Sequence, residues 1–314
     1  MGAGAGRAGV ACLFPGQGTQ RVGMGLELYK GSALARAVLD EVDEALGLPL
    51  TELMFQGPGE ELVKTVNTQP AILAVSLACL KTWEASHDMV KDFQVDYVAG
   101  HSLGEYTALV AAGALGVSDA ARLVQERGRW MQRASEERPG TMAASIGMDE
   151  SRVAELCLEA GVQVSTINAE DQIVIAGHLE GIERAIELAS SRGARRAVSL
   201  QVGGAFHSRL MEPAVEGMQE AISNVRFEEP KVPVIGNCTG LPLTTVAEIK
   251  EELIGQLCNS VQWRRSLVYL LGVGVGIFYE VGPGNVLSGL VRRLAPGVHV
   301  FNVSDLESAQ RGVA

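Results

Sequence analysis

The segment Gly100-His101-Ser102-Leu103-Gly104 constrains the fold of this chain more than any other stretch. Residues 95–99 before it include two valines and a tyrosine and predict a short buried strand, whereas apolar residues recur at helical spacing after it. Ser102 is therefore expected on a tight strand-to-helix turn, which needs small flanking residues and directs the hydroxyl off a sheet edge, beside free helical N–H groups. The pattern G-x-S-x-G also occurs by chance in glycine-rich chains, so a plain strand-turn-helix corner is the alternative.

Composition narrows the class of protein. The 314 residues suffice for one large domain or one and a half, with a substantial core. The net charge of −11 argues against nucleic acid or an anionic membrane as the main partner. Five cysteines without a C-x-x-C pair indicate reduced thiols in a cytoplasmic protein. The five histidines form no metal-binding pattern, so we assign no metal.

The N-terminal third contains three features. Residues 1–9 are rich in glycine and alanine without an apolar core of signal-peptide length, and we expect a frayed leader. Residues 10–14 predict a strand, and Pro15-Gly16-Gln17-Gly18 predicts a turn that a ligand could approach closely. By itself this turn is better interpreted as an ordinary loop. The apolar run 71–80, opened by Pro70, is far shorter than the roughly twenty residues of a membrane span and predicts a core helix.

Arg127 lies on the apolar stripe of a helix predicted to begin near Ser118. It should therefore face inward. A guanidinium stays charged and is costly to bury without an anion, so it needs a carboxylate or phosphate partner. An internal salt bridge satisfies this need as well as a ligand does.

The order of predicted strands and helices along the chain indicates an α/β fold with two parts. Residues 8–137 and 205–308 are expected to form a large, hydrolase-like domain with a mostly parallel sheet, to which strands at 232–235 and 277–281 also belong. Residues 138–204 are expected to form an inserted ferredoxin-like subdomain of order βαββαβ. Its predicted elements are strand Thr141–Ile146, helix Glu150–Ala160, strand Val162–Ile167, strand Ile173–Ala176, helix Leu179–Arg192 and strand Arg196–Leu200.

A serine hydroxyl is a weak nucleophile until a base takes its proton. Among the five histidines, His207 stands on a turn like that of Ser102. It should lie at the same carboxyl edge of a parallel sheet, where ligands bind in such folds. His207 is therefore the best candidate base, although a single loop histidine more often has no catalytic role.

Six segments stand out in order along the chain: residues 13–18 (LFPGQG), 100–106 (GHSLGEY), 125–128 (QERG), 204–208 (GAFHS), 256–263 (QLCNSVQW) and 279–284 (YEVGPG). Together they make the chain, from about Val10 to about Val303, resemble the malonyl-CoA:acyl carrier protein transacylases. The sequence departs from that family's usual pattern at Ser260, where a proline usually follows the asparagine.

The resemblance implies a catalytic set. Ser102 would be acylated and His207 would be its base, oriented by the backbone carbonyl of Gln256 in place of an acidic residue. The backbone N–H groups of Gln17 and Leu103 would form the oxyanion hole.

It also implies how the substrate is held. Arg127 would bind the free carboxylate of the malonyl group through a charged pair, with His101 as a second contact. Phe206 would crowd the carbon that carries the carboxylate, which favours malonyl over methylmalonyl. Arg196 and Arg292, by their position in the resemblance, would contact phosphates of coenzyme A or the carrier; ordinary solvated arginines are the alternative.

The implied activity moves a malonyl group from malonyl-CoA to the phosphopantetheine thiol of acyl carrier protein through a malonyl-serine intermediate, in fatty acid or polyketide synthesis. Malonyl-CoA and acyl carrier protein are the expected partners, coenzyme A enters as part of the substrate with no bound cofactor, and a monomer is the default. A serine esterase or thioesterase with water as acceptor is one alternative. A non-catalytic carrier-binding module is another.

Overall fold

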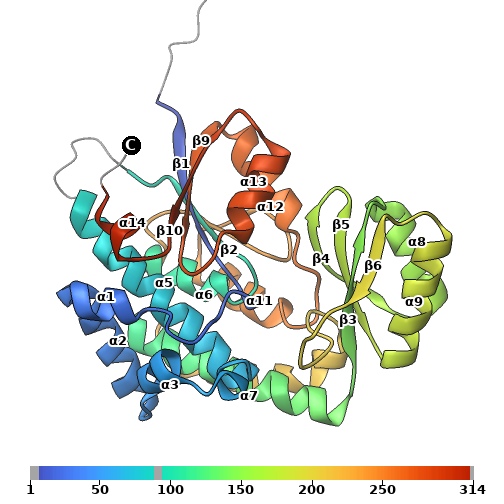
Figure 1. The fold of residues 1–314 in the computed structure, drawn as a ribbon, viewed down its shortest axis with the longest axis horizontal. Coiled ribbons are helices and arrows are strands. Elements are labelled where there is room, and N and C mark those ends of the chain that lie inside the picture. The colour runs from blue at the N-terminus through green and yellow to red at the C-terminus, as the bar shows by residue number, and fades with distance from the viewer. Residues whose placement is uncertain (1–6, 88–93, 312–314) are drawn as a thin grey trace, which may run out of the picture.

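The computed structural model describes residues 7–87 and 94–311 (Figure 1). Residues 1–6 of the expected leader lie outside this part. For the remainder the expectation of a frayed leader is wrong, because Arg7 forms an ion pair of 2.6 Å with Asp96 and Gly9 opens the first strand. None of the helices in the described part has both the length and the apolar character that crossing a bilayer requires.

A six-stranded sheet in the order β10-β9-β1-β2-β7-β8 forms the centre of the large part. All neighbouring strands are parallel except β8, which is antiparallel to β7. The four predicted strands are confirmed with small shifts of their ends, whereas β8 and β10 were not predicted. The strands are β1 (Gly9–Phe14), β2 (Tyr97–Gly100), β7 (Val234–Ile235), β8 (Pro242–Leu243), β9 (Val275–Val281) and β10 (His299–Val303).

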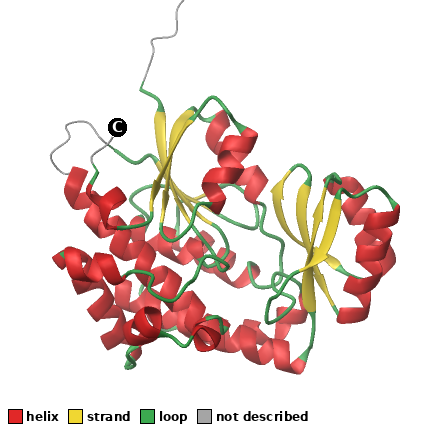
Figure 2. Ribbon diagram, viewed as in Figure 1, coloured by secondary structure: helices red, strands yellow, loops and turns green. Residues whose placement is uncertain are grey.

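Both faces of this sheet are buried, because alternate side chains of β1 enter different cores. Val10, Cys12 and Phe14 join the core that contains residues of α2 (Ala33–Leu46), α5 (Thr65–His87) and α7 (Val117–Glu137). Ala11 and Leu13 join a second core with α12 (Trp263–Gly272) and α13 (Val286–Leu294). Figure 2 shows helices on both sides of the sheet, a three-layer α/β arrangement.

The predicted core helix around residues 71–80 is confirmed as part of α5, but the prediction that Pro70 opens it is wrong, because α5 begins at Thr65 and carries Pro70 inside it. The other helices of the large part are short. They are α1 (Leu26–Gly31), α3 (Leu50–Gln56), α4 (Gly59–Leu62), α6 (Gly104–Ala111), the 3₁₀ helix Arg209–Ala214, α10 (Val215–Ser223), α11 (Val246–Gly255) and α14 (Leu306–Gln310).

Residues 141–199 form a second lobe around a four-stranded antiparallel sheet in the order β4-β5-β3-β6. The observed order β3-α8-β4-β5-α9-β6 agrees with the predicted βαββαβ order. The two helices lie on one side of the sheet (Figure 1) and share a separate hydrophobic core with it. The elements are β3 (Thr141–Ile146), α8 (Glu150–Ala160), β4 (Gln163–Ala169), β5 (Gln172–Gly177), α9 (Leu179–Ser191) and β6 (Arg196–Ser199).

The two lobes are joined through β4. The N–H of Ile167 donates to the carbonyl of Val261 at 2.9 Å, and the N–H of Val261 donates to the carbonyl of Ser165 at 2.9 Å. Asn168, on the same strand, contacts His101 at the end of β2. The second lobe therefore borders the carboxyl edge of the large sheet, where Ser102 lies.

Candidate active site

Ser102 lies on a sharp turn between β2 and α6, as the motif predicts. Its φ is 52°, in the left-handed region. A Cβ on Gly100 would lie 1.9 Å from the carbonyl of Gly104, and one on Gly104 would lie 2.1 Å from the carbonyl oxygen of Phe14. Only glycine fits at either place, so the two motif glycines allow the chain to fold back beside β1 and present the hydroxyl.

His207 is the other non-glycine residue, within the described ranges, that has a positive φ, at 56°. Its Nε2 lies 2.7 Å from the Oγ of Ser102, and its Nδ1 lies 2.7 Å from the backbone carbonyl oxygen of Gln256. A carbonyl only accepts, so Nδ1 carries the hydrogen and Nε2 presents its lone pair to the serine hydroxyl. Two strained backbone positions thus hold a nucleophile and a base in contact.

The surroundings keep His207 neutral. The side chain is buried, and burial, assisted by the positive charge of Arg127, lowers the pKa of His207 to about 3. The hydrogen bond to Gln256 opposes this shift without cancelling it. At neutral pH the imidazole is therefore in its basic form.

Arg127 on α7 is completely buried, as its position on the apolar stripe predicts. Its Nη1 donates to Gln69 at 2.7 Å, and its Nη2 donates to the side chain of Gln256 at 2.7 Å and to the Oγ of Ser102 at 3.2 Å. The guanidinium also lies 5.7 Å from the ring centre of Tyr106. Within the described residues no carboxylate forms an ion pair with it, so the internal salt bridge is excluded there. A full positive charge beside the nucleophile has only neutral partners.

The two predicted oxyanion donors come from adjacent loops. The N–H groups of Leu103 and Gln17 have no hydrogen-bond acceptor among the described residues. The loop of Gln17 packs against the turn of Ser102, since a Cβ on Gly16 would lie 2.6 Å from the carbonyl oxygen of His101. Two donors without acceptors thus belong to loops that pack against each other at the turn of Ser102, and their role remains a prediction.

His101 and Phe206 border the site. The Nε2 of His101 is 2.8 Å from the Oδ1 of Asn168, and its ring packs beside that of Trp263. Because Oδ1 only accepts, Nε2 carries the hydrogen and Nδ1 of the neutral ring has a lone pair, so a contact to a substrate carboxylate requires a reversed Asn168 amide or a protonated ring. Phe206 precedes the candidate base and is buried in the large core. Their predicted contacts to the acyl group remain predictions.

Arg196 and Arg292 are exposed. Arg196 on β6 pairs with Ile146 at one end of β3. The other end of β3 adjoins Ala205 and lies about 17 Å away along the strand. Arg292 is in the last turn of α13, which runs back from the carboxyl edge, and it donates to the carbonyl of Val300. Their predicted contacts to phosphates remain predictions.

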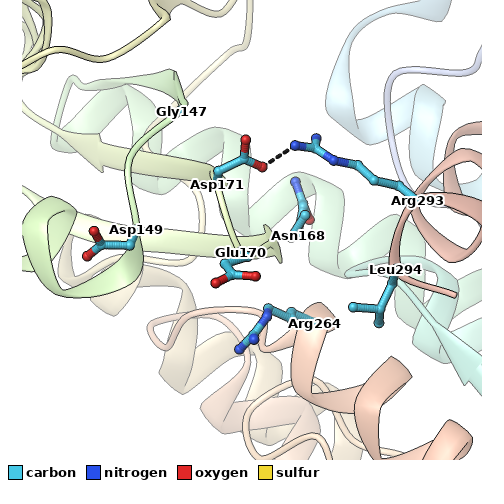
Figure 3. A pocket seen from close by; sticks show the side chains of 9 residues that line it. Gly147, Asp149, Asn168, Glu170, Asp171, Arg264, Arg293 and Leu294 are labelled. Atoms are coloured by element: carbon cyan, nitrogen blue, oxygen red, sulfur yellow. Dashed lines mark hydrogen bonds and ion pairs between the residues drawn. The ribbon is translucent and has the colours of Figure 1, made fainter.

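A cavity of about 560 Å³ lies between the second lobe and helices α12 and α13 (Figure 3). Asn168, which contacts His101, lies on its wall, so the cavity adjoins the site from outside. Two arginines line it: Arg264, and Arg293, which pairs with Asp171. Three carboxylates, those of Asp149, Glu170 and Asp171, line it as well, so the cavity carries charges of both signs.

Three buried polar residues of the site were not found by sequence reasoning. Gln69 binds Arg127, Asn237 accepts the N–H of Ser102 at 2.7 Å, and Glu105 binds Asn237. Asn237 could have been found, because it follows the predicted strand 232–235 at the carboxyl edge of the sheet. No sequence pattern distinguishes Gln69 from any other residue of a core helix.

Comparisons with known proteins agree with this geometry. A family model described as the acyl transferase domain matches residues 12–295. The malonyl CoA-acyl carrier protein transacylase of Bacillus subtilis is 44% identical over 309 residues, 97% of this chain and 96% of that protein. The protein of the same name from Escherichia coli K12 is 42% identical over 288 residues, 90% of this chain and 92% of that protein.

Solved structures show the same likeness. An acyl-carrier-protein S-malonyltransferase from Bartonella henselae has a TM-score of 0.92 at 41% identity, covering 96% of this chain and 97% of its own. A malonyl-transacylase in complex with a type II PKS acyl-carrier protein has a TM-score of 0.90 at 35% identity, covering 96% and 99%. Because the family model spans most of the sequence and these relatives align over nearly all of it, the chain belongs to the malonyl CoA-acyl carrier protein transacylases of the acyl transferase family.

Proposed function

We propose that this protein transfers the malonyl group of malonyl-CoA to the phosphopantetheine thiol of an acyl carrier protein, through an ester on Ser102. One observation carries the proposal: Arg127 is a buried cation, has only neutral partners, and lies 3.2 Å from the nucleophilic oxygen. A guanidinium binds a carboxylate through two parallel hydrogen bonds, and a malonyl group supplies a carboxylate that an acetyl group lacks. The names of the relatives agree with this assignment.

In the first half-reaction the Oγ of Ser102 attacks the thioester carbonyl while the Nε2 of His207 takes its proton. The N–H groups of Gln17 and Leu103 stabilise the oxyanion, a contribution of about 10²–10³ in rate for each such donor. The carbon–sulfur bond then breaks, and coenzyme A leaves as the thiol after its sulfur takes the proton from His207.

The second half-reaction reverses these steps with a new acceptor. The carrier thiol gives its proton to the Nε2 of His207 and attacks the ester carbonyl. The ester bond breaks, and the Oγ of Ser102 recovers the proton. A covalent intermediate between two substrates predicts ping-pong kinetics.

Intact-mass measurement after incubation with malonyl-CoA or acetyl-CoA tests the proposal. We expect a malonyl adduct on the wild-type chain and none on Ser102→Ala. For Arg127→Ala we expect malonyl loading to fall by about 100-fold or more, with acetyl loading retained or increased, because one charged bidentate contact is lost.

Arg133→Ala is the matched control, because Arg133 is exposed on the same helix. It should leave both adducts unchanged. An adduct that survives Ser102→Ala would exclude Ser102 as the nucleophile. Equal loss of both acyl groups in Arg127→Ala would exclude the carboxylate contact.

A serine esterase or thioesterase would use the same nucleophile and base but water as acceptor. Arg127 argues against it, because a hydrolase of neutral esters has no use for a buried, unpaired guanidinium. The malonyl adduct separates the two functions: a transferase passes it to a carrier thiol faster than to water.

The finer assignments follow from this function. We infer that residues 138–204 are a ferredoxin-like subdomain inserted between residues 8–137 and 205–308, which is supported by their strand order and separate core. Arg196 and Arg292 are proposed contacts for distant phosphates of coenzyme A or the carrier. The protein is proposed to act as a cytoplasmic monomer, with its own side chains and the thioester substrate supplying the chemistry.

A further inference from the structure

The side chain of Gln256 connects Arg127 to a buried carboxylate that the reaction steps do not use. Its Oε1 accepts from the Nη2 of Arg127 at 2.7 Å. Its Nε2 donates to the carboxylate of Glu105 at 2.5 Å and to the carbonyl of Ser102 at 3.0 Å. Arg127 and Glu105 therefore lie at opposite ends of one amide group.

The hydrogen bonds around Glu105 suit its charged form. The carboxylate is completely buried and receives three N–H donors: the backbone and side chain of Asn237, at 2.8 and 2.7 Å, and the side chain of Gln256. Burial and the neighbouring carboxylate of Glu252 raise the pKa of Glu105 well above its ordinary value, and these three donors oppose that rise without cancelling it. Hydrogen bonds from three N–H donors stabilise the charged form of a carboxyl group more than its neutral form.

An acceptor at position 105 also decides which way the amide of Gln256 points. Because Glu105 only accepts, the NH₂ group of Gln256 must face it, and the amide oxygen must face Arg127. Were the amide reversed, an N–H group would oppose the guanidinium and another oxygen would oppose the carboxylate.

We propose that Glu105 is the counter-charge of Arg127, acting through the Gln256 amide, so that the guanidinium is balanced while its nitrogens stay available to the substrate carboxylate. This inference deepens the proposed function and rests on it. A carboxylate directly on Arg127 would compete with the malonyl group, and no carboxylate at all would leave a buried charge uncompensated. Because one amide group separates Glu105 from Arg127, the carboxylate balances the charge without occupying the nitrogens that bind the substrate.

Glu105→Gln is the first test. A neutral amide at position 105 cannot accept from Asn237 and from Gln256 without turning an N–H group toward one of them. The Gln256 amide is then no longer held with its oxygen toward Arg127. We expect the ratio of kcat/KM for malonyl-CoA over acetyl-CoA to fall by about tenfold or more, as expected for loss of a charge-assisted contact.

Glu252→Gln is the matched control. Glu252 is also buried, and it accepts the N–H of Cys238 at 2.6 Å without a hydrogen bond to the Gln256 side chain. Its replacement can change stability, but the ratio of kcat/KM for malonyl-CoA over acetyl-CoA should stay at the wild-type value. A purely structural role for buried carboxylates predicts the same behaviour for both variants.

The exchange variant Glu105→Gln/Gln256→Glu tests whether the position of the negative charge, rather than the packing of the pair, decides selectivity. It also replaces Glu105→Gln as the test if that single variant does not fold. It restores an amide-to-carboxylate hydrogen bond between positions 105 and 256 but moves the negative charge onto Arg127. We expect the unfolding midpoint to recover relative to Glu105→Gln while malonyl loading stays at least about tenfold below wild type.

Two results would overturn the inference while the proposed function stands: a malonyl-selective wild type whose Glu105→Gln variant is equally selective, or recovery of malonyl selectivity in the exchange variant. A wild-type protein without any preference for malonyl-CoA would overturn the proposed function and this inference together.

Discussion

At the scale of single residues, the site depends on charge states that burial imposes. His207 remains neutral because a protonated imidazole would be buried beside the guanidinium of Arg127. The same fact links this residue to the stability of the protein. In the unfolded chain His207 regains its ordinary pKa of 6.5, so below that pH the unfolded state binds a proton that the folded state does not.

The folded pKa of His207 is lower than the unfolded one, so its contribution to stability is complete above pH 6.5 and is lost as the pH falls. We predict that wild type loses about 2 kcal/mol more of its free energy of unfolding between pH 7 and pH 5 than His207→Asn does. Urea denaturation of both proteins at the two pH values measures this difference. Equal losses would show that the histidine titrates normally in the folded state.

At the scale of elements, the turn between β2 and α6 depends on the close approach of backbones. Gly104 opens α6 directly against the end of β1, and a Cβ there would lie 2.1 Å from the carbonyl oxygen of Phe14. We predict that Gly104→Ala lowers the free energy of unfolding by about 3 kcal/mol, because either β1 or α6 must move. Urea denaturation at pH 7 measures this change.

Gly116→Ala is the control for this prediction. Gly116 precedes α7 with a negative φ, and a Cβ there would meet no atom within 4 Å. Its replacement should change stability by less than about 0.5 kcal/mol. Similar costs for Gly104→Ala and Gly116→Ala would show that the turn tolerates a side chain.

At the scale of the whole molecule, the second lobe helps to position the base. The Oγ of Ser165 on β4 is buried and donates to the backbone carbonyl of Phe206 at 3.0 Å, one residue before His207. We predict that Ser165→Ala costs about 1–3 kcal/mol of stability, because it leaves a buried carbonyl unpaired, and that it lowers kcat for malonyl transfer. Denaturation and steady-state kinetics measure the two effects.

Ser145→Ala, on β3 of the same lobe, is the matched control. The Oγ of Ser145 is also buried but has no hydrogen-bond partner among the described residues. Its replacement should affect neither stability nor kcat appreciably. A Ser165→Ala protein with unchanged kcat would mean that the lobe does not influence His207.

The sequence by itself determined the local elements and the residue types of the site. The turn of Ser102, the strands β1 and β3 and the helices α8 and α9 follow from periodicity, glycine positions and chain polarity, which act over a few residues. The inward direction of Arg127 follows from helical spacing in the same way. The edge strand β10 was missed, because its pairing with β9 depends on a partner distant from the local pattern.

Only the tertiary structure decided what surrounds these residues. Helical spacing places Arg127 inside but leaves open whether a carboxylate meets it there. The fold instead brings Gln69 from α5 and Gln256 from the end of α11 to the guanidinium, and keeps Glu105 one amide away. These contacts join residues up to 151 positions apart in the chain. Local sequence patterns contain no information about them, because such contacts form only when separate elements pack together.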